Sequence, residues 1–242
     1  MKAFILAAGL GTRLGNLTTD KPKALVEVAG KPMIRHLLEK LTKEGFKEIL
    51  INIHHFGDKV SAYLVQQSFP GLSISVSDER ALLLDTGGAV KKAAAFFEGK
   101  EPVLVHNVDI LTNYDLAGAV ENHKKSKATV TLLVNRRITS RKLLFNKKMK
   151  LAGWKNLQTG EVIWNQMPVK QPVETAYSGI YVASPSFPSL LDKQKQVFPV
   201  VPEWLRIAVS HPVYGVIQNG WWFDLGTQEK IRKAESKMFQ IL

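Results

Sequence analysis

Residue types that bind phosphate occur together near the start of the chain, in the stretch Gly9-Leu10-Gly11-Thr12-Arg13-Leu14-Gly15. Glycines let a backbone approach a phosphate closely and turn its N–H groups inward as an anion-binding nest. Arg13 adds a planar guanidinium whose donors match phosphate oxygens. The glycine spacing alone is equally compatible with a plain tight turn, so the prediction of a phosphate site depends on further residues.

Two well-known phosphate-binding loops fit this stretch less well. In a dinucleotide-binding loop the glycines lead directly into a helix, whereas here Thr18-Thr19-Asp20-Lys21-Pro22-Lys23 intervenes. Pro22 also disfavours a helical conformation at Lys21. The P-loop pattern is absent, because no Gly-Lys-Ser or Gly-Lys-Thr follows the glycines.

Two aspartates more than a hundred positions apart, Asp109 and Asp224, are candidate metal ligands. Asp109 follows the apolar run Val103–Val105, and ligands of open α/β sheets bind where such strands end. Asp224 lies in an apolar segment that stops at Gly226. A carboxylate in apolar surroundings needs compensation, which a bound cation would supply. Each aspartate taken alone could instead cap a following turn or helix.

Two segments together, Leu6-Ala7-Ala8-Gly9-Leu10-Gly11-Thr12-Arg13-Leu14 and Lys21-Pro22-Lys23-Ala24-Leu25, resemble the signature of the nucleotide-sugar pyrophosphorylases, which are sugar-1-phosphate nucleotidyltransferases. The resemblance implies a first loop that wraps the nucleotide and its phosphates. Arg13 would lie on the β/γ side and Lys23 against the α-phosphate, both as catalytic residues. The nucleotide-binding residues implied in this part are Leu6, Ala8, Gly9, Gly11 and Thr12. The family usually has a proline where this chain has Asn16.

The resemblance extends to both aspartates. His106-Asn107-Val108-Asp109 stands where the family carries Asn-Gly-Asp or a similar element, and Phe223-Asp224-Leu225-Gly226-Thr227 is similar to its Asp-x-Gly-Thr element. This likeness implies that Asp109 and Asp224 hold a catalytic Mg²⁺ and that Asn107 contacts the nucleotide. Val108 replaces the common glycine and could narrow the space beside the metal.

Base and sugar pockets are also implied by the resemblance. The stretch Asp85-Thr86-Gly87-Gly88-Ala89 is similar to the branch that contains N-acetylmuramate-1-phosphate uridylyltransferases, which act in cell-wall recycling, and mannose-1-phosphate guanylyltransferases. It places Thr86, Gly87 and Gly88 in the base pocket, although these residues also suit a helix N-cap. The implied sugar-binding residues are Tyr177, Ser178, Gly179 and Lys155. Trp154 stands in place of the acid in the family's Glu-Lys pair. The segment that begins at Tyr177 also suits an ordinary strand.

Alternating elements must position these residues. Apolar patterns predict strands at residues 2–8, 48–53, 72–76, 102–105, 128–134 and 176–183, and helices at 33–41, 60–67, 86–97, 114–125 and 227–239. Hairpins are predicted around 146–149 and 158–160. We therefore expect a single-domain α/β protein with a mostly parallel, Rossmann-like sheet flanked by helices. The resemblance makes this a GT-A-like nucleotidyltransferase fold with a β-rich sugar-binding insertion. Its expected parts are nucleotide-binding (1–135), sugar-binding (136–225) and a C-terminal helix (226–242).

Composition narrows the class of protein. The chain has 242 residues, 45% of them hydrophobic, a net charge of +12 and no cysteine, so disulfides and cysteine metal sites are excluded. No apolar run reaches the length of a membrane span, and the six histidines show no metal-ligand spacing. The charge favours anionic partners, but no basic helix or aromatic stacking motif supports nucleic-acid binding. We expect a cytoplasmic monomer or small homo-oligomer that binds neither nucleic acid nor membrane.

These features predict the reaction of an NTP with a sugar 1-phosphate to give an NDP-sugar and pyrophosphate. UTP is favoured, with an N-acetylated sugar such as N-acetylmuramate 1-phosphate. A mannose-1-phosphate guanylyltransferase and a non-catalytic nucleotide-binding relative are the alternatives. A glycosyltransferase is disfavoured, because it normally carries Asp-x-Asp where Asn107-Val108-Asp109 supplies one acid.

Overall fold

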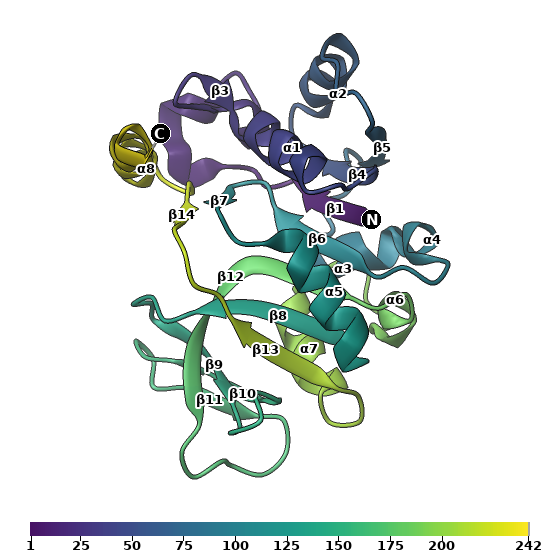
Figure 1. Cartoon of the computed structure of the whole chain (residues 1–242), viewed down its shortest axis with the longest axis vertical. Coiled ribbons are helices and arrows are strands. Elements are labelled where there is room, and N and C mark those ends of the chain that lie inside the picture. The colour runs from purple at the N-terminus through teal and green to yellow at the C-terminus, as the bar shows by residue number, and fades with distance from the viewer. Residues whose placement is uncertain (242) are drawn as a thin grey trace. The chain divides into compact units, whose positions relative to one another are not determined.

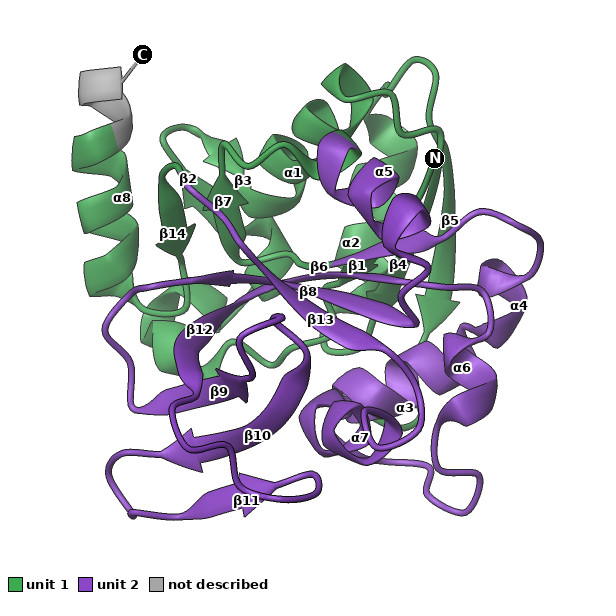
Figure 2. Cartoon of the chain, turned by 60° about the horizontal axis from the view of Figure 1, so that its bottom comes forward, with its two compact units in different colours: residues 1–83, 106–117, 220–242 green, residues 84–105, 118–219 purple. Residues whose placement is uncertain are grey.

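The computed structural model describes residues 1–241, and their contacts form two compact units (Figure 2). Unit 1 comprises Met1–Leu83, His106–Ala117 and Gly220–Leu242, and unit 2 comprises Leu84–Val105 and Gly118–Asn219. The chain therefore passes between the units four times. These bounds differ from the expected parts at 1–135, 136–225 and 226–242, which stay a prediction.

Three parallel strands of the main sheet form the centre of unit 1. Strand β4 (Glu48–Ile53) lies between β1 (Lys2–Leu6) and β5 (Ser73–Asp78). Phe4 and Ile5 of β1 are completely buried, as expected for a strand covered on both faces. The predicted parallel arrangement and the α/β class are confirmed for these elements.

Helix α1 (Met33–Lys43) follows the glycine turn. Its buried residues recur at helical spacing, and they are Met33, Ile34, Leu37, Leu38 and Leu41. The helix expected at 33–41 is confirmed and runs two residues further. Pro32 is its extended N-cap residue, and Gly45, with a φ of 79°, lies just past its end.

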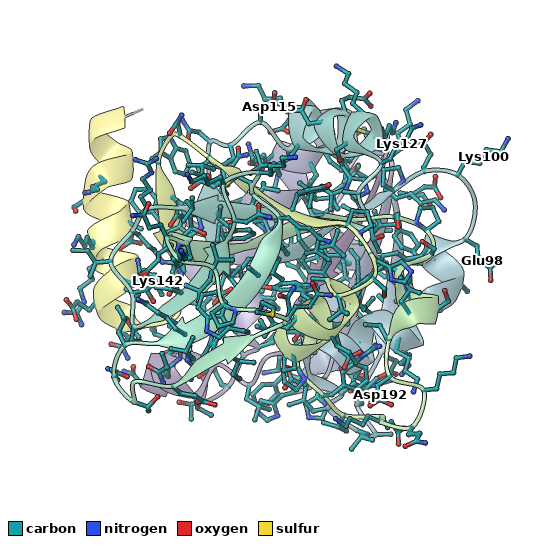
Figure 3. All side chains as sticks on the ribbon, turned by 90° about the horizontal axis from the view of Figure 1, so that it is seen from below. Glu98, Lys100, Asp115, Lys127, Lys142 and Asp192 are labelled. Carbon is teal, nitrogen blue, oxygen red and sulfur yellow. The ribbon has the colours of Figure 1, made fainter. Side chains whose placement is uncertain are left out.

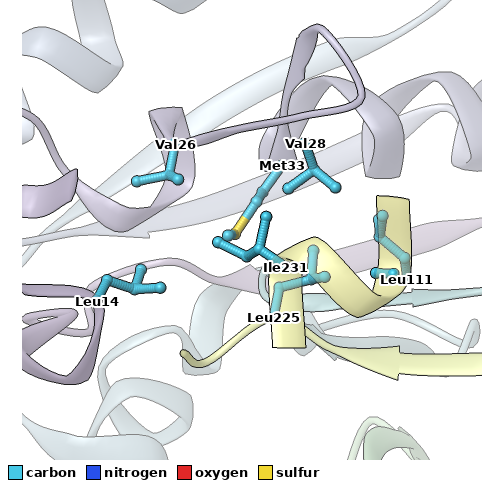
Figure 4. Close-up of a cluster of buried hydrophobic side chains, with 8 residues drawn as sticks. Leu14, Val26, Val28, Met33, Leu111, Leu225 and Ile231 are labelled. Carbon is cyan, nitrogen blue, oxygen red and sulfur yellow. The ribbon is translucent and has the colours of Figure 1, made fainter. Parts of the chain in front are cut away.

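Short elements complete unit 1. They are η1 (Thr12–Thr18), η2 (Lys23–Leu25), β2 (Glu27–Val28), β3 (Lys31–Pro32), α2 (Gly57–Gln66), β7 (Ile110–Thr112), β14 (Trp222–Asp224) and α8 (Gln228–Ile241). An apolar cluster joins several of them, as Figure 4 shows: Leu14 from η1, Leu111 from β7 and Ile231 from α8 pack with Leu225. This cluster fixes Leu14, near the end of the glycine turn (Gly9–Gly15), against the last helix.

Unit 2 is built around β8 (Val130–Asn135), whose six residues are all buried. Strand β12 (Val173–Ala183) pairs with it antiparallel, and β13 (Val213–Ile217) pairs with it parallel (Figure 1). The hairpin strands β9 (Arg141–Phe145), β10 (Leu151–Asn156) and β11 (Val162–Trp164) continue antiparallel from β12. The predicted β-rich insertion with two hairpins is thereby confirmed.

Five helices and one more strand remain. The helices are α3 (Asp85–Lys92), α4 (Ala94–Phe97), α5 (Leu116–Ser126), α6 (Phe187–Leu190) and α7 (Val200–Ile207). Strand β6 (Val103–Asn107) and helix α5 each cross from one unit to the other.

Several sequence predictions of local structure were wrong. The single helix expected at 86–97 is interrupted at Ala93, so α3 and α4 are separate. Helix α7 and strand β13 were not predicted, because the prolines and short apolar runs between 198 and 217 give no clear period.

Some charged side chains project well away from the chain. Lys100 and Glu98 point outward from the ribbon in Figure 3. Within residues 1–241 no helix has the length and apolar character needed to cross a membrane.

Candidate active site

The glycine turn of unit 1 is held by close packing around Gly11. Gly11 has a φ of 69°, and a Cβ atom there would lie 2.9 Å from Cγ2 of Thr18 and 3.1 Å from Cβ of Lys23. The Thr18 hydroxyl donates to the carbonyl groups of Gly11 and Gly15 at 3.1 and 3.2 Å. Glycine at position 11 thus allows the turn to close directly against Lys23.

A buried amide supports the end of β1. The Oδ1 atom of Asn52 accepts hydrogen bonds from the N–H groups of Ala7 and Ala8 at 2.6 and 3.2 Å, and its Nδ2 atom donates to Glu79 at 2.8 Å. Asn52 is 3% exposed and Glu79 is 1% exposed. The Leu6 carbonyl accepts from the Val108 N–H at 3.1 Å. The backbone donor of Ala8 and the acceptor of Leu6 are therefore already used within the protein.

The tip of the turn is open to ligands. Gly9, Leu10 and Arg13 are exposed, and among the residues that the structure describes no hydrogen bond uses the N–H groups of Gly9, Leu10 or Gly11. Arg13 makes no ion pair with any described carboxylate. Unsatisfied N–H groups beside a guanidinium form an anion-binding concavity. This geometry suits the phosphates for which the turn was predicted.

Asp109 and Asp224 meet in unit 1 despite their distance in the sequence. Strands β7 and β14 pair antiparallel, with Asp224 opposite Ile110. The Leu225 N–H then donates to the Asp109 carbonyl at 2.8 Å. This ladder brings the backbones of the two aspartates side by side, as binding of one Mg²⁺ by both residues would require.

Each aspartate is paired with a lysine. Lys23 Nζ contacts Oδ2 of Asp109, and Lys230 Nζ contacts Oδ2 of Asp224, while Oδ1 of Asp224 accepts from the Gly226 N–H at 2.8 Å. Burial raises the pKa of Asp224, but the hydrogen bonds from Lys230 and Gly226, with the charges of Lys230 and Lys23, bring that pKa below its usual value. Asp224 is thus a carboxylate at neutral pH.

These residues fit a divalent cation. Mg²⁺ is commonly held by one or two carboxylates, with substrate phosphates and water completing its coordination. Asp109 and Asp224 are mostly buried, and the pairing of β7 with β14 makes their backbones adjacent. Within residues 1–241 no group of three or more His, Cys, Asp or Glu side chains could hold a metal. Any ion bound here would therefore depend on ligands beyond these two carboxylates.

Gly226 connects the aspartates to Arg13. A Cβ atom at this position would lie 2.8 Å from Oδ1 of Asp224 and 3.0 Å from Nη2 of Arg13. The guanidinium therefore lies directly over the backbone that follows Asp224. Unit 1 thereby brings together Arg13, Lys23, Asp109 and Asp224, four of the residues with predicted roles. Asn107 ends β6 two residues before Asp109, and its carbonyl lies 2.8 Å from Nδ1 of His106.

Replacement of Lys230 should change how stability depends on pH. Lys230 lowers the pKa of Asp224, and a lowered carboxyl pKa gives stability that is present above the unfolded pKa and lost as pH falls through the folded pKa. We expect Lys230→Met to be less stable than wild type at pH 7, with the difference shrinking below about pH 4. Urea unfolding from pH 3 to pH 7 measures this. A difference that does not depend on pH would contradict the role of the ion pair.

Thr86, Gly87 and Gly88 of unit 2 lie at the start of α3 and contact the segment that leads into α7. The N–H groups of Gly87 and Gly88 donate to the Phe198 carbonyl at 2.9 and 3.2 Å, and the Thr86 hydroxyl accepts from the Val200 N–H at 3.0 Å. These three groups are therefore used inside the protein. Their place in a base pocket stays a prediction. Contacts with a base would have to come from other atoms of this segment.

Gly88→Ala should destabilise unit 2. A Cβ atom at position 88 would lie 2.2 Å from the Gln196 carbonyl oxygen, so the backbone of that segment would have to move. We expect a loss of about 1–3 kcal/mol in the free energy of unfolding, measured by thermal or urea unfolding. Gly9→Ala is the control, since no atom lies within 4 Å of a Cβ there. Equal stability of both variants would show that the segment is not packed in this way.

The residues predicted to bind the sugar lie on strands β10 and β12 of unit 2. Lys155 on β10 pairs with Glu174 on β12 at 2.5 Å, two strands away across β9. Tyr177 packs edge-on against Trp204, with ring centroids 5.0 Å apart. Ser178 is completely buried, and its hydroxyl donates to the Leu133 carbonyl at 2.7 Å.

An irregularity in β12 accounts for that burial. The register with β8 shifts between Tyr177 and Ile180, and Gly179 has a φ of 84°. Such a bulge redirects the side chains on either side of it. The structure thus places Lys155, Tyr177, Ser178 and Gly179 on one sheet, and their contact with a sugar stays a prediction.

Comparison with known proteins shows the family of the chain. Residues 2–143 match the nucleotidyl transferase family model. An N-acetylmuramate alpha-1-phosphate uridylyltransferase of Caulobacter vibrioides is 34% identical, over 98% of this chain and 96% of that protein. The chain belongs to the nucleotidyl transferase family.

Two further relatives of this nucleotidyl transferase extend the comparison. The mannose-1-phosphate guanylyltransferase catalytic subunit beta of Dictyostelium discoideum is 29% identical over 93% of this chain, which spans 61% of that protein's length. A crystal structure of UDP-glucose pyrophosphorylase from Acinetobacter baumanii has a TM-score of 0.76 and 17% identity, over 99% of this chain and 97% of that one. The structural likeness confirms the predicted nucleotidyltransferase fold. The family match confirms that the protein is an enzyme that transfers nucleotidyl groups, and it supports the sugar-1-phosphate class.

Sequence reasoning missed several residues of this nucleotidyl transferase site. Lys230 is exposed and Gln228 is half-buried in the first turn of a charged helix, where lysine and glutamine are ordinary. Asn52 and Glu79 lie in or beside strands that were read only for their apolar pattern. A polar amide inside the apolar run Glu48–Ile53 was the one available signal, since a buried polar group needs a partner.

Proposed function

We propose that this protein transfers a uridylyl group from UTP to an N-acetylated sugar 1-phosphate, such as N-acetylmuramate 1-phosphate, and releases pyrophosphate. The adjacency of Asp109 and Asp224 beside Lys23 and Arg13 is the observation that carries the reaction class. The identity of 34% to an N-acetylmuramate alpha-1-phosphate uridylyltransferase over nearly the whole chain supports the choice of substrates. The role in cell-wall recycling in the cytoplasm that the sequence resemblance implies is part of the same proposal.

In the proposed reaction a phosphate oxygen of the sugar 1-phosphate attacks the α-phosphorus of the NTP. A new phosphorus–oxygen bond forms as the bond to pyrophosphate breaks, and the displacement is in line. Mg²⁺ held by Asp109 and Asp224 would neutralise charge on the phosphate oxygens. Lys23, next to these carboxylates, offsets the charge that develops at the α-phosphate. Arg13 and the open N–H groups of the glycine turn hold the β- and γ-phosphates.

Mannose-1-phosphate guanylyltransferase activity is the second candidate. The relative from Dictyostelium discoideum with that name is 29% identical over 93% of this chain. The stretch Asp85–Ala89 was predicted to suit either branch. Uridylyl transfer is favoured because the uridylyltransferase relative is more similar, at 34% identity against 29%.

One assay tests the proposal. Pyrophosphate release is measured for each of the four NTPs with N-acetylmuramate, N-acetylglucosamine, mannose and glucose 1-phosphates in the presence of Mg²⁺. We expect the highest kcat/KM with UTP and an N-acetylated sugar, and loss of turnover when EDTA removes the metal. Preference for GTP with mannose 1-phosphate would establish the second candidate. No turnover with any pair would refute both.

A further inference from the structure

A polar side chain of the first turn of α8, Gln228, reaches the glycine turn beside the apolar contact of Ile231 with Leu14. Its Nε2 atom donates to the Leu14 carbonyl at 2.7 Å and to Oδ1 of Asn16 at 2.6 Å. These acceptors lie on either side of Gly15, whose φ of 58° and ψ of −124° kink η1. One amide group therefore spans the kink from a position 214 residues after Leu14.

This kink helps to set the position of Arg13. Leu14 is completely buried against Leu225 and Ile231, whereas Arg13 is exposed and lies over Gly226 (Figure 4 shows Leu14 and its apolar neighbours). The apolar packing fixes the Leu14 side chain. Hydrogen bonds hold the rest of the turn from Leu14 to Asn16: Gln228 donates to the Leu14 carbonyl and to the Asn16 side chain, and the Thr18 hydroxyl donates to the Gly15 carbonyl.

Asn16 is the residue that stands where the resembled family usually has proline. Proline fixes its own φ and reduces the conformations open to a turn. Asn16 brings no such restriction, but its side chain gives Gln228 an acceptor. The hydrogen bond between them can restrain this turn through a residue of α8, whereas a proline would restrain the turn through its own backbone.

We propose that Gln228 is a positioning residue, which holds the turn from Arg13 to Asn16 so that Arg13 meets the β- and γ-phosphates of the NTP. The identity of the ligand rests on the proposed function. The hydrogen bonds of Gln228 are features of the structure and do not depend on that function. Gln228 touches no reacting atom in this proposal and acts through the geometry of the turn.

Kinetics of matched variants test the proposal. Gln228→Met keeps the length of the side chain and removes both hydrogen bonds. We expect the KM for UTP to rise about tenfold, the factor that one or two hydrogen bonds are worth, with a much smaller change in kcat. Glu229→Ala, an exposed neighbour in the same turn, should leave both constants at their wild-type values.

A rescue variant separates positioning from a general loss of packing. Adding Asn16→Pro to Gln228→Met should return the KM for UTP to within about twofold of wild type, because proline restricts the turn by itself. A KM that stays raised in the double variant would overturn the proposal, as would a wild-type KM in Gln228→Met.

A second readout needs no turnover. Trypsin cleaves after Arg13, and mass spectrometry of quenched and denatured samples can follow this cut in the folded protein. We expect faster cleavage at Arg13 in Gln228→Met than in Glu229→Ala, at equal melting temperatures. Equal cleavage rates would overturn the proposal. If the wild-type protein turned over no NTP, the proposed function would fail, and this comparison would still test the hydrogen bonds of Gln228.

Discussion

Asp109→Asn should abolish most of the pyrophosphate release while the protein remains folded. Asp109 lies next to Asp224 through the pairing of β7 with β14, and asparagine keeps its size but removes its charge. A neutral amide holds Mg²⁺ less well than a carboxylate. We expect turnover to fall about a thousandfold, the loss that follows removal of one electrostatic group from such a site.

Calorimetric titration with Mg²⁺ should show weaker binding by Asp109→Asn than by wild type. Asp20→Asn is the control, because Asp20 is an exposed carboxylate of the same unit. Turnover by Asp109→Asn within a few-fold of that of Asp20→Asn would show that the metal and the reaction lie elsewhere.

Lys23→Met should have the second largest effect. Lys23 is 12% exposed, is paired with Asp109 and packs its Cβ against Gly11. Methionine keeps the apolar stem but removes the charge that offsets the developing negative charge at the α-phosphate. We expect kcat to fall about a hundredfold or more, with a smaller change in the KM for the sugar 1-phosphate.

Lys21→Met, two residues away, is the matched control and should retain wild-type kcat. Stability gives an independent check, because Lys23→Met leaves Asp109 without its ion-pair partner. The double variant with Asp109→Asn should recover part of the lost melting temperature without recovering turnover. If the double variant were more stable than Lys23→Met and also recovered turnover, Lys23 would have only a structural role.

The sequence determined the residues that lie at strand ends and turns in unit 1. The mainly apolar run Glu48–Ile53 coincides with β4, because a strand buried on both faces needs mostly apolar side chains. Gly11 and Arg13 were recognised because glycine and arginine have few substitutes in a turn that binds phosphate. Asp109 and Asp224 were found by their position after apolar strands and by the family motifs.

The sequence was less informative where side chains serve the backbone of distant segments. Thr86, Gly87 and Gly88 use their hydroxyl and N–H groups on Phe198 and Val200, more than a hundred positions away. A glycine that allows close approach of another segment looks the same, in sequence, as one that allows close approach of a ligand. Only the tertiary structure separates the two cases.

The amino-acid order by itself determined the α/β class, because the apolar period fixes it, and it was enough to predict a phosphate-binding turn and two acidic metal ligands from local chemistry and the family motifs. Tertiary structure decided that Asp109 and Asp224 are neighbours, since the pairing of β7 with β14 depends on folding of the whole unit. It also decided that Lys230 compensates Asp224 and that Gln228 holds the glycine turn. Hydrogen bonds between positions 214 residues apart leave no period or motif in a sequence, because they depend on where the folded backbone brings each side chain.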